Sequence, residues 1–312
     1  MPDLPLIVDI KRHSLEDGPG IRSVVFFKGC PLRCVFCQNP ETQDPYIEIL
    51  FSESDCIMCG GCKEVCPQSA IDLNVPGHID RDRCDRCGEC ASVCPGYGLK
   101  KIGSFYDVEA LTEILLRDIA FYRHSGGGVT LSGGECTLYP DYLESLLKLL
   151  KAEGIHITLE TSGYFNYDIF KEKILPYIDL IYYDIKIAES EGHFRITGRP
   201  NVKIFGNLRR LLKEKDVEVI PRVPLIPGIT ANHENLSAIA WSVYEAGADK
   251  IVLLPYNPMG MDMYTKLGRQ KPALPERFMR PDEEKEVYEM FGDIIKDLED
   301  LRLTTTWNAK GG

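Results

Sequence analysis

"IRSVVFFKGCPLRCVFCQN", residues 21–39, joins a short apolar run to three closely spaced cysteines. The run at 22–27 is typical of a buried β-strand, because Val and Phe favour a packed, pleated environment. Cys30, Cys34 and Cys37 follow it with the spacing C-x3-C-x2-C. Three thiolates on a four-iron cluster leave one iron without a protein ligand, and an open metal position is where a substrate binds in catalytic sites. For this group alone, chance or a zinc site is the competing interpretation.

Downstream of these cysteines the chain alternates between helical and strand-like patterns. Strands are predicted at 22–27, 128–133, 155–163, 178–186, 217–228 and 248–256. Helices are predicted at 107–124, 140–154, 166–177, 201–215, 232–247 and 281–300. Such alternation indicates parallel βα units, and six strands are fewer than the eight of a closed barrel. We therefore expect an α/β fold, a partial open (β/α)6 TIM-like barrel, with a doubly wound sheet as the alternative; in both, ligands bind at the carboxyl ends of the strands.

A second cysteine-rich segment contains two copies of one pattern, "CIMCGGCKEVCP" and "CDRCGECASVCP". The spacing C-x2-C-x2-C-x3-C-P is that of two-cluster bacterial ferredoxins, in which the fourth Cys of each run ligates the other cluster. The expected ligand sets are Cys56, Cys59, Cys62 and Cys94 for one [4Fe–4S] cluster and Cys84, Cys87, Cys90 and Cys66 for another. A pair of structural zinc sites is the alternative. The predicted domains are a barrel of residues 1–54 and 98–312 and a ferredoxin-like insertion of residues 55–97.

Composition excludes several classes of protein. The 312 residues carry a net charge of -11 without a basic stripe, which argues against nucleic acid as the main partner. No apolar run approaches the roughly 20 residues of a membrane span, and the N-terminus lacks the features of a signal peptide. We therefore expect a cytoplasmic protein with no membrane partner. In that compartment thiols stay reduced, so the 12 cysteines are not expected to form disulfides. Eleven of them cluster between residues 30 and 94, which indicates metal ligation, and only Cys136 stands apart.

Several motifs resemble one known family. "CPLRCVFC" at 30–37 is similar to the signature of radical S-adenosylmethionine (SAM) enzymes, with Phe36 as its aromatic residue. "EDGPGIRSVVFFKGCPLRCVFCQNPE", "SGGE" at 132–135, "DIK" at 184–186 and "LPYN" at 254–257 resemble motifs of glycyl radical enzyme activating enzymes, including those with extra clusters. Two positions depart from that pattern: Cys136 stands where proline is usual, and Asn257 stands where some members have histidine.

The resemblance implies a reaction and its participants. It implies three [4Fe–4S] clusters and SAM, whose methionyl amino and carboxylate groups would occupy the open iron of the 30–37 cluster. Reductive cleavage of SAM would yield a 5′-deoxyadenosyl radical that takes a hydrogen atom from a glycine of a partner glycyl radical enzyme. A flavodoxin- or ferredoxin-type protein is the expected reductant. A radical SAM enzyme acting on a small molecule is one alternative; an iron–sulfur electron carrier is another, although a carrier needs no 200-residue βα scaffold.

The resemblance also implies which residues bind SAM. The candidates are Phe36, Cys37, Gln38, Gly133, Gly134, Glu135, Glu160, Asp184, Ile185, Lys186, Arg222 and Asn257. Asp184 and Lys186 alternate with Ile185, so both point to one face, where a carboxylate and an ammonium suit a zwitterion. A salt bridge at the barrel rim is the alternative for these charges. Asp17, in "EDGPG", resembles the position that contacts the incoming glycine loop, and a simple turn is the alternative there.

Overall fold

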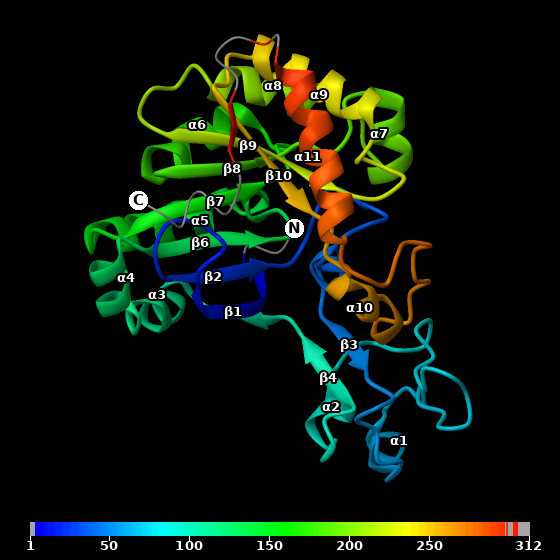
Figure 1. Ribbon diagram of the computed structural model, residues 1–312. Helices are drawn as coiled ribbons and strands as arrows, with labels where there is room; N and C mark the ends of the chain where they lie inside the picture. Colours follow the sequence, from blue (N-terminus) through cyan, green and yellow to red (C-terminus); the bar gives the residue numbers. More distant parts are fainter. Residues whose placement is uncertain (1–3, 297, 299–301, 305–312) are drawn as a thin grey trace.

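A computed structural model describes residues 4–296, 298 and 302–304 (Figure 1). Within them one open sheet has the strand order β11-β10-β9-β8-β7-β6-β2-β1-β5. Its six central strands are β2 (Arg22–Phe27), β6 (Gly128–Gly133), β7 (His156–Thr161), β8 (Leu180–Asp184), β9 (Glu218–Leu225) and β10 (Lys250–Pro255). These are the six predicted strands, and each pairs in parallel with the next. The predicted α/β fold with a mostly parallel sheet is thus confirmed.

The strand order separates the two topologies left open by the sequence. From β2 to β10 the order follows the chain without the reversal that a doubly wound sheet would show. Three strands at the edges escaped prediction: β1 (Leu6–Ser14), β5 (Ser104–Phe105) and β11 (Arg302–Thr304). β1 runs antiparallel to β2, and its many charged residues hide the alternation expected of a strand.

Helices cover one face of the curved sheet (Figure 1). They are α3 (Val108–Leu116), α4 (Ile119–Ser125), α5 (Pro140–Ala152), α6 (Tyr167–Lys173), α8 (Val202–Leu211), α9 (His233–Glu245) and α11 (Pro281–Ile295). Two further helices, α7 (Ser190–Thr197) and α10 (Met261–Lys266), lie beside the cysteine loop instead. The predicted helix 107–124 is in fact two helices, broken where the buried Asp118 accepts hydrogen bonds from Arg12 and Ser23. α7 and α10 were not predicted. Residues 297, 299 and 300 of the predicted helix 281–300 lie outside the described residues.

Alternate residues of the central strands face opposite environments. Leu131, Leu159 and Ile181 are fully buried in the core formed with the helices. Their neighbours Glu160 and Tyr182 point to the other, concave face and are only partly buried. Parallel strands are normally covered on both faces, so this partly exposed concave face is where another molecule can lie. No helix in the described ranges is both long and apolar enough to cross a bilayer.

A small unit projects from the sheet between β3 (Glu48–Phe51) and β4 (Leu99–Ile102), which pair antiparallel (Figure 1). It contains α1 (Gly61–Val65) and α2 (Glu89–Ser92) and spans the predicted insertion 55–97. The two cysteine copies repeat the same unusual backbone. Matching residues with positive φ are Met58 (57°) and Arg86 (64°), Gly60 (82°) and Gly88 (91°), and Ser69 (46°) and Tyr97 (56°). The sequence repeat is therefore also a structural repeat.

Candidate functional site

The loop after β2 brings the first three cysteines to the carboxyl edge of the sheet. Backbone hydrogen bonds hold this loop on both sides. Cys30 N donates to Gln43 O at 2.9 Å, Arg33 N to Thr197 O at 2.7 Å, and Val35 N to Ile196 O at 3.1 Å. The end of α7 and the segment around residue 43 therefore fix the loop. Between residues 32 and 36 buried and exposed side chains alternate, with Cys34 among the buried ones.

The three thiols lie together in an apolar setting. Phe36 is buried beside Leu32, Cys34 and Tyr256. Burial raises the pKa of Cys37 to about 12, and the neighbouring Cys34 thiol adds to the rise. Burial also raises the pKa of Cys30, again with a contribution from Cys34. Three adjacent thiols fit the cluster that the signature implies, because binding of iron stabilises the thiolates that burial disfavours.

A network of four alternating charges lies at the carboxyl ends of β7, β8 and β9. Arg222 donates from Nη1 to Glu160 Oε1 at 2.8 Å, and from Nε and Nη2 to Asp184 Oδ1 at 3.1 and 3.0 Å. Lys186 Nζ is 3.5 Å from Asp184 Oδ2, and the Ser132 hydroxyl donates to Glu160 at 2.5 Å. The register pairs Asp184 directly with Arg222, which explains how residues 38 positions apart meet.

Opposite charges in this network stabilise one another. Burial by itself would raise the pKa of Asp184, but Arg222 and Lys186 outweigh it and hold the pKa below the usual value. Burial works against the charge of Lys186, yet Asp184 and the thiols of the cysteine loop raise its pKa. The network is neutral in sum, and its carboxylates remain partly exposed. Two anions and two cations at one rim can exchange partners with the amino and carboxylate groups of a zwitterionic ligand.

The "SGGE" loop packs directly against the backbone before Cys30. A Cβ on Gly133, whose φ is +102°, would lie 2.3 Å from Phe27 N, and one on Gly134 would lie 2.2 Å from Gly29 O. Gly134 N donates to Phe27 O at 2.8 Å, and Glu135 N donates to Gly29 O at 2.7 Å. Both glycines are therefore needed for close packing of two loops. That the loop also touches SAM stays a prediction.

Glu135 has a structural set of partners. Its buried carboxylate accepts hydrogen bonds from the hydroxyls of Thr137 at 2.7 Å and Thr161 at 2.8 Å, and from both the backbone N–H and the hydroxyl of Ser162 at 2.9 and 2.6 Å. These donors tie the loop to the end of β7. The sequence did not indicate this anchoring role, and contact of Glu135 with the cofactor stays a prediction.

Three other predicted SAM-binding residues, Gln38, Asn257 and Ile185, differ in their exposure and in their contacts. Gln38 is exposed, and its backbone packs against Gly260, where a Cβ would lie 2.1 Å from Gln38 O. Asn257 accepts a hydrogen bond from Met259 N at 2.9 Å and so caps the turn η4 (Pro258–Gly260). The Ile185 side chain is buried in the helix-side core, so its backbone carbonyl is its only group available to a ligand.

Asp17 lies at the other end of the concave face, because its loop precedes β2. Its carboxylate accepts a hydrogen bond from Ser14 and lies 3.7 Å from Lys11 Nζ. The Thr130 hydroxyl donates to Asp17 O at 2.7 Å. The structure thus places Asp17 at the floor of the concave face, away from the cysteine loop at its rim.

Arg22 holds this loop and was missed by the sequence reasoning. It is fully buried, and burial lowers its pKa to about 10. It donates to Thr130 Oγ1 and Pro19 O, both at 2.8 Å, and to Val129 O at 2.7 Å. An arginine at the first position of an apolar strand was the available signal.

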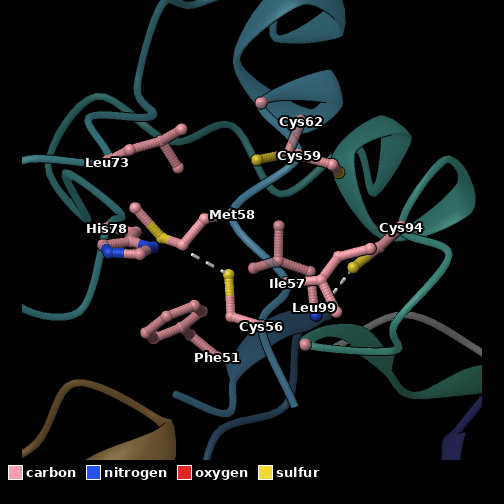
Figure 2. A pocket seen from close by; sticks show the side chains of 12 residues that line it. Phe51, Cys56, Ile57, Met58, Cys59, Cys62, Leu73, His78, Cys94 and Leu99 are labelled. Atoms are coloured by element: carbon pink, nitrogen blue, oxygen red, sulfur yellow. Dashed lines mark hydrogen bonds between the residues drawn. The ribbon is translucent and has the colours of Figure 1, made fainter. Parts of the chain in front are cut away.

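The insertion gathers cysteines from both copies. Figure 2 shows a cavity whose lining includes Cys94 together with the cysteines of the first copy up to residue 62. The cavity cysteines are Cys56, Cys59, Cys62 and Cys94, the first expected ligand set. Burial raises the pKa of Cys90 to about 11, and the nearby thiols of Cys84, Cys87 and Cys66 add to it. In the described part of the chain, no three His, Cys, Asp or Glu side chains converge on one metal-ion position.

Two thiols of the insertion also accept backbone hydrogen bonds. Ala70 N donates to Cys66 Sγ at 3.2 Å, and Leu99 N donates to Cys94 Sγ at 3.4 Å, the latter drawn in Figure 2. Cys66 and Cys94 are the fourth cysteines of their copies. The cavity thus brings the fourth cysteine of the second copy beside three cysteines of the first, and the exchange of fourth ligands stays a prediction.

Comparison with known proteins gives a consistent result. The family profile described as "Radical SAM superfamily" matches residues 24–237. The benzylsuccinate synthase activating enzyme of Thauera aromatica is 40% identical over 274 residues, which cover 85% of this chain and 82% of the relative. The trans-4-hydroxy-L-proline dehydratase activating enzyme of Clostridioides difficile is 37% identical, with 90% and 93% covered.

Among solved structures, Streptococcus suis SuiB bound to its precursor peptide SuiA has a TM-score of 0.52. It is 14% identical, and the match covers 88% of this chain and 46% of SuiB. At that identity the likeness concerns the fold alone.

Proposed function

Because the chain belongs to the radical SAM superfamily and, within it, to the activating enzymes of glycyl radical enzymes, we propose that it takes a hydrogen atom from a backbone glycine of a partner enzyme. The family implies a [4Fe–4S] cluster and SAM. When bound, these supply an electron and a cleavable sulfonium, and thus the 5′-deoxyadenosyl radical. The observation that carries the proposal is the meeting of three adjacent thiols and a balanced charge network at one rim.

We assign the residues as follows. Cys30, Cys34 and Cys37 hold the cluster and leave one iron open for the methionyl group. Lys186 and Arg222 offer cationic donors to its carboxylate, and the partly exposed carboxylates of the network offer acceptors to amino and hydroxyl groups. Support comes from the partial exposure of these carboxylates in an otherwise buried rim.

The partner approaches along the concave face. Relatives are named for the activation of different enzymes, a synthase and a dehydratase, so the shared reactive group must be part of the protein rather than a substrate. A protein loop needs an open route, and the partly exposed strand residues of the concave face provide one. Asp17 lies at its floor, and its carboxylate, which accepts a hydrogen bond from the Ser14 hydroxyl, would also accept backbone N–H groups of the incoming loop.

Two further [4Fe–4S] clusters occupy the insertion, one on each mixed set of four cysteines, and a flavodoxin- or ferredoxin-type protein supplies the electrons. The repeated backbone conformation and the presence of Cys94 in the cavity of the first copy support this assignment. A small protein that cannot build a large core commonly uses such metal sites for stability.

Metal analysis tests cluster content. Anaerobic reconstitution should give about 12 irons per chain, the content of three four-iron clusters. About 4 irons, or zinc, would contradict the assignment of the insertion. Cys34→Ala should abolish SAM cleavage, whereas Cys59→Ala should retain part of it with a strong artificial reductant. Cys136→Ala, at a buried cysteine outside the three groups, is the matched control and should leave the iron content unchanged.

Spectroscopy tests the hydrogen donor. Reduced holoprotein, SAM and a glycyl radical enzyme, for which the product of the neighbouring gene is the candidate to test, should give a glycyl electron paramagnetic resonance doublet that collapses when the partner contains α-deuterated glycine. Asp17→Ala should weaken docking of the partner by about 1.5–3 kcal/mol, the range for hydrogen bonds to charged groups, and leave partner-free SAM cleavage intact. Consumption of a small molecule together with SAM, without any glycyl signal, would favour the small-molecule alternative.

A further inference from the structure

We propose that a basic surface on α7 and the start of α8 docks an acidic one-electron carrier protein that reduces the cluster of the cysteine loop. This inference rests on the proposed function and assigns the entry point of its electrons. The α7–α8 basic surface consists of Arg33, Val35, Phe194, Arg195, Arg199, Val202 and Lys203, all of them exposed.

The charge of this region is opposite to that of the whole chain. The surface contains the cations Arg33, Arg195, Arg199 and Lys203, whereas the chain carries -11 overall. Arg33 pairs with Asp44, and Arg195 pairs with Glu189 and Glu191, so Arg199 and Lys203 supply the uncompensated positive charge. A local positive field on an acidic protein steers acidic partners to one place and repels them elsewhere.

Two cations share one aromatic ring at the centre of this surface. Arg199 Cζ lies 5.9 Å and Lys203 Nζ 4.8 Å from the centroid of the Tyr164 ring. Across residues 4–296 neither cation forms an ion pair with a carboxylate. A ring face attracts a cation only weakly at an exposed site, so two like charges remain largely uncompensated there. An incoming carboxylate would neutralise them.

The surface adjoins the cysteine loop. Arg199 Nε donates to Pro31 O at 3.2 Å, and the backbones of Arg33 and Val35 are bonded to the end of α7. Arg33 and Val35 are the two neighbours of Cys34 in the chain. A carrier seated on this surface is therefore one residue away from a cluster ligand.

The composition of the surface fits a transient redox partner. Phe194 and Val202 are 55% and 71% exposed and lie among the cations, which is the pattern of an apolar centre with a charged rim. Weak electron-transfer encounters use small interfaces of this kind. The helix carrying Lys203 packs through Ile204 and Leu208 on the outer, helix-covered side of the sheet. The surface thus leaves the concave face free for the glycine loop.

The electron count is balanced. The carrier loses one electron, and the sulfonium of SAM takes up one as its S–C5′ bond breaks into methionine and the 5′-deoxyadenosyl radical. The surface itself takes part only in docking.

The test compares two charge-reversed variants of the reconstituted holoprotein. Arg199→Glu/Lys203→Glu changes the surface. Lys213→Glu/Lys215→Glu is the matched control, because these residues are exposed, without ion pairs in the described chain, and precede β9 at the opposite end of the sheet. A purified acidic flavodoxin in its reduced form is the probe. Binding is measured by calorimetry with redox-inactive apoflavodoxin, and reduction of the cluster by stopped-flow absorbance.

At low salt we expect the surface variant to bind apoflavodoxin about 10-fold or more weakly than the wild type. Its cluster should also be reduced about 10-fold or more slowly, since electrostatic steering changes association rates by that order. The control should behave like the wild type, and the difference should vanish near 1 M salt, where charges are screened. Lys203→Glu alone, which preserves the contact of Arg199 with Pro31, should show a smaller loss in the same direction. Dithionite should drive SAM cleavage equally in all variants.

Three outcomes would overturn the proposal. Equal losses in both variants would indicate an effect of net charge. Unchanged reduction with weakened glycyl radical formation would indicate that the surface binds the partner enzyme. If only substitutions in the insertion slowed reduction of the cluster by flavodoxin, electrons would enter through the insertion rather than through this surface. Absence of dithionite-driven SAM cleavage in the wild type would instead refute the proposed function, while the binding measurement would still judge the surface.

Discussion

Replacing Glu135 by Gln tests whether its carboxylate anchors the "SGGE" loop. Gln keeps the shape but has one acceptor oxygen where the carboxylate has two. Four donors meet the carboxylate: the hydroxyls of Thr137, Thr161 and Ser162 and the backbone N–H of Ser162. The amide oxygen can serve both donors of Ser162, and the two threonine hydroxyls must turn to accept from the new NH2 group.

The expected cost follows from the change in bond type. Hydrogen bonds to a charged group contribute about 1.5–3 kcal/mol, against about 0.5–1.5 kcal/mol between neutral groups, so each of the donors loses about 1 kcal/mol. The lower cost of burying a neutral amide offsets part of this loss. We expect a net destabilisation of about 2–3 kcal/mol. This lowers Tm by about 3–5 °C, because the entropy of unfolding of a 312-residue chain is about 650 cal/mol/K.

The assay is thermal unfolding of the anaerobically reconstituted protein, followed by circular dichroism. Glu144→Gln is the matched control, because that carboxylate lies on the surface of α5 beside Lys148 and Lys173. Such surface pairs contribute about 0–1 kcal/mol, so the control should shift Tm by no more than about 1.5 °C. Equal shifts in the two variants, or no shift for Glu135→Gln, would refute the anchoring role.

Two further predictions concern buried charge. Arg222→Met should destabilise the protein by about 3 kcal/mol, the lower end of the range for breaking a buried pair, because it leaves the partly buried carboxylates of Glu160 and Asp184 without their shared cation. It should also abolish SAM binding. Unfolding and calorimetry measure the two effects, and retention of both stability and binding would contradict the network's role. Burial lowers the pKa of His193, whose Nδ1–H donates to Arg199 O at 2.6 Å. In the unfolded chain this imidazole takes up a proton near pH 6.5, whereas in the native state it stays neutral at that pH. The free energy of unfolding should therefore fall as pH drops below about 6.5. His193→Asn, which keeps a side-chain N–H donor for Arg199 O, should flatten the decline of Tm between about pH 7.5 and 5.5.

The sequence by itself determined the features that depend on residues close together in the chain, namely the central strands and the cysteine groups. The six central strands are short apolar runs between helical patterns, and such periodicity survives folding because each element buries the face that its sequence makes apolar. The three cysteine groups are recognisable for the same reason: ligand spacing of two or three residues is a property of the chain. The predicted SAM contacts also fall where strands end, which is why most of them lie at one rim.

Tertiary structure alone decided which distant residues become partners. Arg222 meets Asp184 and Glu160 because parallel register aligns β7, β8 and β9, and no periodicity in the sequence encodes that register. Asp17 and the cysteine loop lie close in sequence yet at opposite ends of the sheet, since a whole strand separates them. β1 was not predicted because its pairing through the backbone, with β2 along its length and with β5 at only two residues, tolerates charged side chains. The fold class can thus be predicted from short-range patterns that repeat along the chain. The pairing of charged side chains cannot, because it depends on the register that the strands adopt once the sheet has formed.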